Sequence, residues 1–207
     1  MKNIGAIIFD CDGVMFDSHR ANLAYYNRIL AQFSYSQVSP EQKELAQMCH
    51  TASSAEVLTN LFHPDDVTAA REFAATVDYL EFLPDMEPEA DFLTLLRRLS
   101  GHYPLAIATN RGKSISAVLE YFSLQHYFSV VVSCHDVEYP KPAPDMLLLA
   151  AERLEIKAES CLFVGDSNLD KLAAAAANMQ FAGYGGEVSA PISLTNHLQL
   201  LDYLSIK

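Results

Sequence analysis

The sequence has no tryptophan and little glycine, which accounts for 8 of its 207 residues. Glycine is also unevenly placed, because none occurs between Gly13 and Gly101. Such a stretch lacks the residue that many tight turns require, so it favours helices. No segment reaches the roughly 18–20 uncharged apolar residues of a membrane-spanning helix, and we expect no membrane partner.

Basic residues are scarce as well: 14 Lys and Arg stand against 26 Asp and Glu, for a formal net charge of −12. Binding a polyanion depends on clustered Lys and Arg, so we expect no nucleic-acid partner. Segment 1–4 carries one positive charge before a short apolar run that ends in Asp10, which does not fit a signal peptide. The four cysteines contain no C-x-x-C pair, which predicts reduced, mostly buried thiols in a cytoplasmic protein and no zinc site.

Two aspartates two residues apart, Asp10 and Asp12, follow the apolar run 4–9. Residues two apart on a strand point the same way. Two carboxylates at about 4 Å repel by about 4 kcal/mol at an effective dielectric near 20, so the pair calls for a cation or a proton. We therefore expect Asp10 to raise the pKa of Asp12. An EF-hand is excluded, because its fifth, sixth and twelfth positions hold Val14, Met15 and Ala21.

The chain after residue 85 alternates between apolar runs typical of strands and segments of helical periodicity. The expected strands are 104–109, 129–133, 161–164 and 181–183, and the expected helices are 89–99, 113–122, 145–154 and 169–179. Apolar strands without alternation, separated by helices, predict an α/β fold: a Rossmann-like parallel sheet covered by helices on both faces. The last helix ends at Asn178, a residue suited to a left-handed helix terminus.

The stretch between Asp17 and Leu83 repeats apolar residues at helical spacing, which predicts three or four helices. Ser53 or Ser54, just before Glu56, is one expected helix start. We therefore predict an α/β core formed by residues 1–14 and 85–207, with an inserted α-helical cap domain formed by 15–84.

Polar residues follow several of the predicted strands and would meet at one edge of a parallel sheet. They are Asp10 and Asp12, then Thr109, Asn110 and Arg111, then Lys141 in a later loop, then Asp166, Ser167 and Asp170. Each alone has an ordinary alternative. Thr109 and Asn110 are compatible with a helix cap, Lys141 with an exposed turn, and Ser167 with a helix N-cap. The four groups together, in this order, indicate an active site.

These residues form the sequences Asp10-Cys11-Asp12-Gly13-Val14, Thr109-Asn110, Lys141-Pro142 and Gly165-Asp166-Ser167 with Asp170. Their order and the position of the helical insertion resemble haloacid dehalogenase-like hydrolases, in the subgroup of phosphoglycolate phosphatase and beta-phosphoglucomutase-like proteins. The resemblance covers essentially the whole chain. It implies a phosphatase that uses Mg²⁺ and forms an aspartyl-phosphate intermediate on a small phosphorylated metabolite.

The resemblance also implies roles for individual residues. Asp10 is the expected nucleophile and Asp12 the general acid and base. The expected Mg²⁺ ligands are the carboxylates of Asp10 and Asp166 and the main-chain carbonyl of Asp12. Thr109 and the backbone N–H of Asn110 are expected to bind the phosphoryl oxygens, and Lys141 to bridge Asp10 and the phosphate. Asp170, Ser167 and Arg111 are secondary candidates; Asp170 holds metal-bound water, holds Lys141 or caps its helix.

The cap is expected to contact the leaving group, with His50 and Ser53 as candidates beside Ser54, His19 and Arg20. The alternatives are solvent-facing positions for His19 and Arg20 and a helix N-cap for Ser53 or Ser54. Many acidic residues in 15–84 disfavour a highly anionic substrate. Two other functions remain open: a sugar-phosphate mutase, which the lack of Arg and Lys in 49–54 makes less favoured, and a non-catalytic binding protein. The oligomeric state is open as well.

Overall fold

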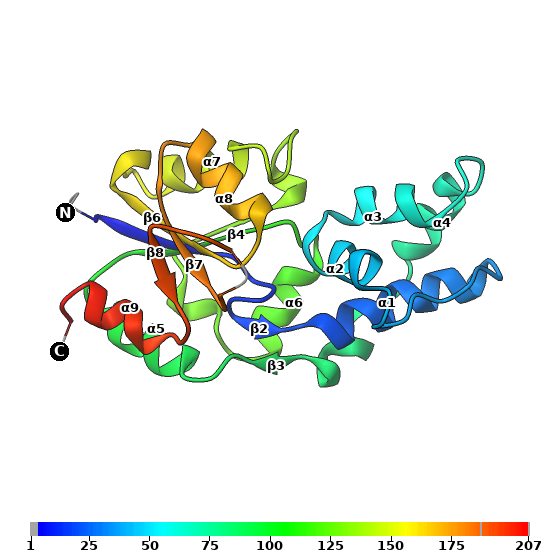
Figure 1. Ribbon diagram of the computed structural model, residues 1–207, viewed down its shortest axis with the longest axis horizontal. Helices are drawn as coiled ribbons and strands as arrows, with labels where there is room; N and C mark the ends of the chain where they lie inside the picture. Colours follow the sequence, from blue (N-terminus) through cyan, green and yellow to red (C-terminus); the bar gives the residue numbers. More distant parts are fainter. Residues whose placement is uncertain (1–3, 187, 207) are drawn as a thin grey trace.

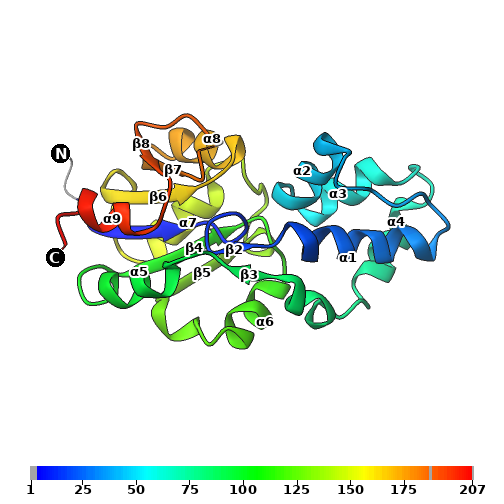
Figure 2. The same cartoon turned by 60° about the horizontal axis from the view of Figure 1, so that its bottom comes forward.

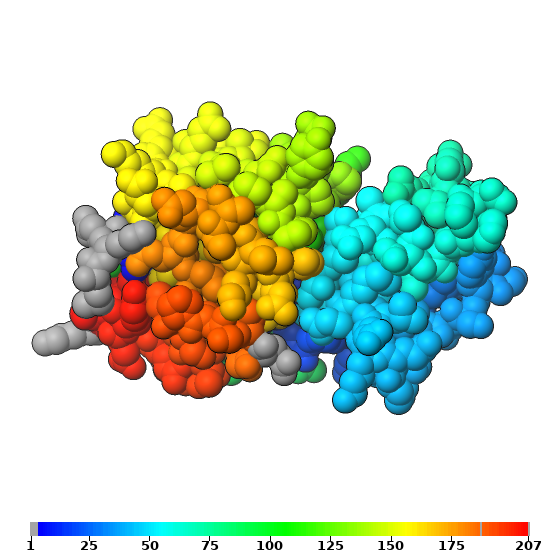
Figure 3. Space-filling model, turned by 45° about the horizontal axis from the view of Figure 1, so that its top comes forward, coloured from blue at the N-terminus to red at the C-terminus, as the bar shows by residue number. Residues whose placement is uncertain are grey.

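Two lobes make up the computed structural model, which describes residues 4–186 and 188–206 (Figure 1). One lobe is a sheet with helices on both faces, and the other is a group of helices (Figure 2). Figure 3 shows the helical lobe, in blue and cyan, packed against one end of the sheet lobe. Among the described residues, no helix has the length and apolar character needed to cross a membrane.

The sheet has six strands in the order β5-β4-β1-β6-β7-β8, and every neighbouring pair is parallel. The strands are β1 Ala6–Phe9, β4 Leu105–Thr109, β5 Val130–Ser133, β6 Cys161–Gly165, β7 Gln180–Tyr184 and β8 Ile192–Leu194. The predicted Rossmann-like parallel sheet is confirmed. Strand β1 lies between β4 and β6, so the residues that follow it emerge in the middle of the sheet.

Alternate residues of β1 face two separate hydrophobic clusters. Ile7 and Phe9 pack with helices α5, α6 and α9, whereas Ala6 and Ile8 pack with α7 and α8. The helices are α5 Phe92–Leu99, α6 Ser114–Tyr121, α7 Asp145–Arg153, α8 Asn168–Ala176 and α9 Leu198–Tyr203. Both faces of β1 are therefore buried, which explains why its sequence is apolar without alternation.

The helical lobe comprises α1 His19–Gln32, α2 Lys43–Thr51, α3 Ser54–Leu61 and α4 Val67–Ala74. Its four helices agree with the three or four predicted, and they share a third hydrophobic cluster that includes Tyr26, Ile29 and Leu58. Ser53 is the N-cap of α3, since its side chain accepts a hydrogen bond from the Glu56 N–H. The boundaries 15 and 84 of the cap stay a prediction.

Some short elements were not predicted. A two-stranded antiparallel sheet of β2 Phe16–Asp17 and β3 Glu87–Pro88 joins the two lobes, next to the 3₁₀ helix η1 Tyr79–Asp85. β8 and α9 were missed too. The helix predicted from residue 89 begins at Phe92, because Asp91 takes a left-handed conformation with φ 62°. The left-handed end at Asn178 is confirmed, with φ 55°.

The described cysteines are all free, as expected. Cys11, Cys49 and Cys161 are buried, and Cys134 is partly buried.

Candidate active site

Three strand ends and one loop bring the predicted polar residues to one edge of the sheet. Asp10 directly follows β1, and its N–H donates to the Val164 carbonyl of β6 at 2.9 Å. Thr109 is the last residue of β4, and Asp166 directly follows β6. This is the carboxyl edge at which parallel α/β sheets bind their ligands.

Lys141 joins two of the acids. Its Nζ lies 2.8 Å from Asp10 Oδ1 and 2.6 Å from Asp170 Oδ1, and its side chain is 2% exposed. Burial alone would lower the pKa of Lys141, but the Asp10 and Asp170 carboxylates outweigh burial and raise it. Lys141 is therefore a fixed positive charge beside Asp10.

Asp170 has two functions in its local structure. Besides pairing with Lys141, it forms a capping box at the start of α8: its Oδ2 accepts from Ser167 N at 3.0 Å and from Ser167 Oγ at 2.6 Å. Ser167 thus holds Asp170 in place. Asp170 therefore both caps α8 and pairs with Lys141, two of the roles that the sequence left open.

Asp10, Asp166 and Asp170 form an acidic cluster whose ligand oxygens lie within 4.8 Å of one another. Burial raises the pKa of Asp10, with Lys141 opposing the shift, and burial together with Asp170 and Asp10 raises the pKa of Asp166. Asp166 Oδ1 is buried and has no hydrogen-bond partner among the described residues. Clustered carboxylates short of positive charge, with one oxygen unsatisfied, fit a hard divalent cation such as Mg²⁺.

Gly13 permits this cluster to form. Its backbone has φ +74°, and a Cβ atom there would lie 2.0 Å from Asp166 Oδ2. A larger residue at position 13 would displace the carboxylate, so the glycine after the aspartate pair is required by close approach.

Asp12 lies apart from the acidic cluster and is held by Arg111. Arg111 Nε donates to Asp12 Oδ2 at 3.1 Å, and Arg111 Nη2 donates to Asp12 Oδ1. Ser18 Oγ and Asn22 Nδ2 also donate to Oδ1. Burial would raise the pKa of Asp12, but the Arg111 charge and hydrogen bonds outweigh it and hold the pKa well below its usual range. The expectation of a raised pKa was wrong, because it considered Asp10 and not Arg111.

Thr109 and Asn110 are buried at the end of β4. Thr109 Oγ1 accepts from the Arg111 N–H at 3.1 Å, and Thr109 lines the cavity described below. The Asn110 side chain accepts from Lys141 N at 3.0 Å and donates to the carbonyls of Lys141 and Thr51. Asn110 therefore ties the Lys141 loop and the helical lobe to β4.

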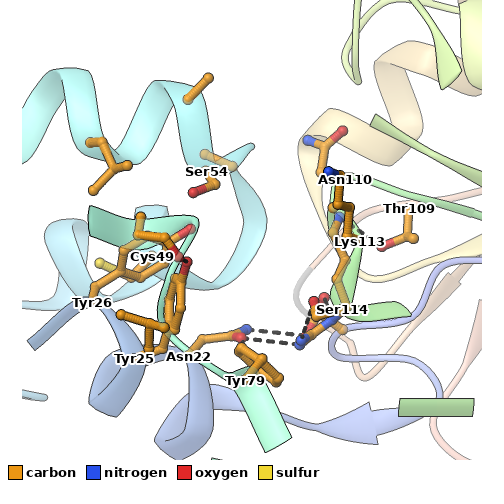
Figure 4. Close-up of a pocket in the computed structure, with 18 of the residues that line it drawn as sticks. Asn22, Tyr25, Tyr26, Cys49, Ser54, Tyr79, Thr109, Asn110, Lys113 and Ser114 are labelled. Atoms are coloured by element: carbon orange, nitrogen blue, oxygen red, sulfur yellow. Dashed lines mark hydrogen bonds and ion pairs between the residues drawn. The ribbon is translucent and has the colours of Figure 1, made fainter. Parts of the chain in front are cut away.

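The two lobes enclose a cavity of about 690 Å³ whose lining includes Asp10, Asp12, Thr109 and Arg111. Figure 4 shows Tyr26, Cys49 and Ser54 on one side and Thr109, Asn110 and Lys113 on the other. The size suits a small ligand.

The five cap candidates occupy different positions. His50 is buried in the cavity wall, and its Nε2 lies 4.0 Å from Asp166 Oδ2; burial lowers its pKa to about 4. Ser54 also lines the cavity, whereas Ser53 is a helix cap. His19 is exposed and stacks on His50, with ring centroids 3.5 Å apart. Arg20 is exposed and pairs with Asp85 at 3.1 Å.

Three residues that contact this site were not singled out from the sequence: Ser18, Asn22 and Tyr79. Tyr79 Oη donates to Asn22 Oδ1 at 2.6 Å, and its ring lies 4.6 Å from the Arg111 guanidinium carbon. Ser18 and Asn22 are four residues apart, at and after the start of α1, and so share a helix face. Ser18 and Asn22 could have been found from the sequence, because they lie six and ten residues after Asp12 and share one helix face.

The sheet edge with its acids and lysine, covered by a helical lobe, defines the class of protein. A family model described as haloacid dehalogenase-like hydrolase matches residues 7–184. The chain belongs to this family and is a hydrolase.

Two proteins named as phosphatases are similar to this chain. The chain is 29% identical to phosphoglycolate phosphatase of Escherichia coli strain K12, over 94% of this chain and 87% of that protein. It is 27% identical to a fructose-1-phosphate phosphatase of the same strain, over 86% of this chain and 95% of that protein.

Solved structures agree with this family. A subfamily IA hydrolase of the superfamily from Geobacter sulfurreducens superposes with a TM-score of 0.86 at 38% identity, covering 97% of this chain and 99% of that one. A beta-phosphoglucomutase from Clostridium difficile superposes with a TM-score of 0.83, covering 98% of this chain and 96% of that one. At 18% identity, the second likeness shows the fold alone.

Proposed function

We propose that this protein is a Mg²⁺-dependent phosphatase that hydrolyses a small phosphorylated metabolite through an aspartyl-phosphate on Asp10. The observation that carries the proposal is Lys141, whose ammonium group contacts Asp10 at 2.8 Å beside the cluster with Asp166. Phosphoryl transfer requires a nucleophile surrounded by positive charge, because both the nucleophile and the phosphate are anionic. The two relatives named as phosphatases support the same reaction class.

Asp10 and Asp166 would hold the metal ion with their carboxylates, together with the main-chain carbonyl of Asp12. When bound, the ion neutralises charge on the carboxylates and on the phosphoryl oxygens. The buried, unsatisfied Oδ1 of Asp166 supports this assignment.

In the first step, an Asp10 carboxylate oxygen attacks phosphorus and the bond from phosphorus to the ester oxygen breaks. Asp12, in its protonated form, gives a proton to the departing oxygen, although Arg111 favours the carboxylate form in the free site. In the second step, Asp12 takes a proton from water, and the water oxygen attacks the aspartyl-phosphate. Phosphate leaves and Asp10 is restored as a carboxylate.

The remaining residues orient the phosphoryl group. Lys141 offsets charge on Asp10, and Asp170 keeps Lys141 in position through its 2.6 Å contact. Thr109 and the backbone N–H of Asn110 bind phosphoryl oxygens. His50 and Ser54 line the cavity on the cap side, where the leaving group would lie.

A mutase is less well supported. Residues 49–52 and 54 line the cavity, yet segment 49–54 has no Lys or Arg to hold a second phosphate. Arg71 of α4 also lines the cavity, but its Nη2 donates to the Ala55 carbonyl and to Thr59 Oγ1 within the cap. A non-catalytic role conflicts with the clustered acids, since repelling carboxylates without a reaction to perform are costly. The free cysteines, three of them buried, support a reducing compartment, and we place the protein in the cytoplasm.

The test is phosphate release from a panel of small phosphate monoesters, with Mg²⁺ and with a chelator. We expect turnover for the wild type with Mg²⁺ only, and loss by at least about a thousandfold for Asp10→Asn, because the amide is a poor nucleophile. An Asp10→Asn variant as active as the wild type refutes the proposal.

A further inference from the structure

The cavity between the lobes is larger than the phosphoryl group alone requires. Its volume of about 690 Å³ lies in the range of pockets that hold drug-sized ligands. Residues proposed to act on the phosphoryl group, such as Asp10 and Thr109, line it from the core. Figure 4 shows Tyr25 and Tyr26 on the opposite side, which the cap forms. The lining of the cap side therefore decides which leaving group fits.

The hydrophobic cluster of the cap is open towards this cavity. Five residues belong to that cluster or pack against it and also line the cavity: Tyr25, Tyr26, Leu58, Ala74 and Val77. Apolar surface that faces a cavity gains free energy when an apolar ligand covers it and water leaves. The cap thus offers a leaving group the same kind of contact that its own core residues make with one another.

Three aromatic rings lie together in this lining. The ring centroid of Tyr25 is 5.1 Å from that of Tyr26 and 5.4 Å from that of Tyr79, at interplanar angles of 72° and 56°. Aromatic rings attract one another in such edge-on and tilted arrangements. A ring in the ligand can join this group in the same way, whereas an aliphatic chain would gain from burial alone.

Several polar side chains on the cap side already have hydrogen-bond partners within the cap. Thr51 and Thr76 each donate through Oγ1 to a main-chain carbonyl, at 3.1 and 2.7 Å. Tyr25 Oη does the same at 3.2 Å, and Arg71 Nη2 donates to a carbonyl and a hydroxyl of α3. His50 differs, since neither ring nitrogen has a partner among the described residues. A sugar bound here would find few partners for its hydroxyls, and burying a hydroxyl without a hydrogen bond is unfavourable.

We propose that the cap side of the cavity binds an aromatic leaving group, so that the substrates are phosphate monoesters of alcohols or phenols that carry an apolar ring. The ring lies against Tyr25, Tyr26 and Val77, with the phosphoryl group at Asp10. Such a substrate has no second acidic group, which agrees with the acidic composition of residues 15–84. The inference rests on the proposed phosphatase function and names its substrate class.

The test compares three esters of primary alcohols: benzyl phosphate, glucose 6-phosphate and ethyl phosphate. The first two both carry a six-membered ring one carbon away from the ester oxygen, but one ring is apolar and the other bears hydroxyls. We expect wild-type kcat/KM to be at least about tenfold higher for benzyl phosphate than for either of the others, because only its ring gains from burial in an apolar lining.

Val77→Asn tests the site within the cavity, and Val67→Asn is the matched control. Both valines are partly buried and pack against the hydrophobic cluster of the cap; of these two described residues, Val77 lines the cavity and Val67 does not. Val77→Asn should lower kcat/KM for benzyl phosphate about fivefold or more, and for ethyl phosphate less than about twofold, because the amide needs a hydrogen-bond partner that a ring does not supply. Val67→Asn should change the ratio of the two values by less than about twofold.

A binding measurement on the wild type makes the test independent of turnover and of the folding of the variants, which thermal unfolding checks. The ligands are 2-phenylethylphosphonate and propylphosphonate, in which a methylene group replaces the ester oxygen of benzyl phosphate and ethyl phosphate. Calorimetry with Mg²⁺ present should show at least about tenfold tighter binding of 2-phenylethylphosphonate.

The possible failures are distinguishable. If the wild type hydrolyses glucose 6-phosphate or ethyl phosphate as well as benzyl phosphate, or if Val77→Asn leaves the preference unchanged, the aromatic site is overturned and the phosphatase stands. If the wild type is inert towards all phosphate monoesters, the phosphatase is overturned. Tighter binding of 2-phenylethylphosphonate would then still support the aromatic site, and equal binding of the two phosphonates would overturn both.

Discussion

His50 Nε2, from the helical lobe, lies 4.0 Å from Oδ2 of Asp166 in the acidic cluster of the core. Neither ring nitrogen of His50 has a hydrogen-bond partner among the described residues, although the side chain is 1% exposed. Burying a polar group without a partner costs free energy, typically about 1–3 kcal/mol. The ring nitrogens of His50, buried beside a candidate metal site, are therefore available to hydrogen-bond with a bound ligand.

We therefore predict that His50→Asn lowers kcat/KM by about tenfold, the effect of losing one hydrogen bond in a buried site. The control is His19→Asn, since His19 stacks on His50 but is exposed. It should change kcat/KM by less than about threefold. Steady-state kinetics on any substrate that the wild type turns over makes the comparison, and equal effects of the two changes would contradict the role of His50.

Asp170→Asn should destabilise the protein by about 2–3 kcal/mol, because it removes one of the two carboxylates that pair with buried Lys141, while Asp10 remains as the other. The chain offers a matched control in Asp136. That residue forms the same kind of capping box, with Ser133, but its ion-pair partner Arg153 is 42% exposed. Asp136→Asn should cost about 1 kcal/mol. Urea unfolding measures both, and similar losses would refute the importance of the lysine pair.

Acid should destabilise the fold through His197. This residue is buried, its Nε2 lies 2.8 Å from the Val14 carbonyl, and burial lowers its pKa from 6.5 to about 4. The folded protein binds a proton at His197 less readily than the unfolded chain does. His197 therefore contributes its full stability to the fold only above pH 6.5, where both states are neutral. That contribution is lost as the pH falls from 6.5 towards 4, by about 3 kcal/mol in all.

The measurement is the unfolding free energy of the wild type and of His197→Asn between pH 7 and pH 4. The advantage of the wild type should shrink as the pH falls. The exposed His102→Asn serves as the control, and the His197→Asn difference should depend on pH more strongly than the His102→Asn difference does. A His197→Asn difference that does not change with pH would show that protonation of His197 does not matter.

Binding of Mg²⁺ should release protons. Burial raises the pKa of Asp10 and Asp166 in the metal-free site, and a metal ion binds their deprotonated forms. Affinity should therefore increase with pH from about 5.5 to 8, by up to about tenfold per unit for each proton released. Calorimetry in buffers of different ionisation enthalpy counts the protons. Asp166→Asn should weaken binding, and an affinity independent of pH would contradict the raised pKa values.

The sheet and the residues at its edge were predictable from sequence because their signals are local. A strand buried on both faces needs an apolar run, as in Ala6–Phe9, and the polar residues that follow it lie at the carboxyl edge. Asp10 and Asp166 were expected at this edge for that reason, whereas Lys141 lies in a loop and was expected there from the order of the four groups. Elements of two or three residues, such as β2 and Ile192–Leu194, are too short to show a period.

The surroundings of Asp12 were not predictable by the same means. Arg111 and Asp12 are 99 residues apart, and Asn22 and Tyr79 reach Arg111 only because the helical lobe packs against the core. No local pattern encodes that packing. The pKa of Asp12 depends on this contact between the lobes, so composition and spacing gave the wrong direction.

The central claim is that Asp10 carries the phosphoryl group, and trapping that group tests it most directly. Asp12→Asn would be mixed with p-nitrophenyl phosphate and Mg²⁺, quenched in acid, and mapped by mass spectrometry. The nitrophenolate leaves without a proton from Asp12, but water is not activated, so one phosphoryl group should accumulate on the peptide that contains Asp10. The label should be absent from the Asp10→Asn, Asp12→Asn double variant. A label on another residue, or turnover without any labelled enzyme, would contradict the mechanism.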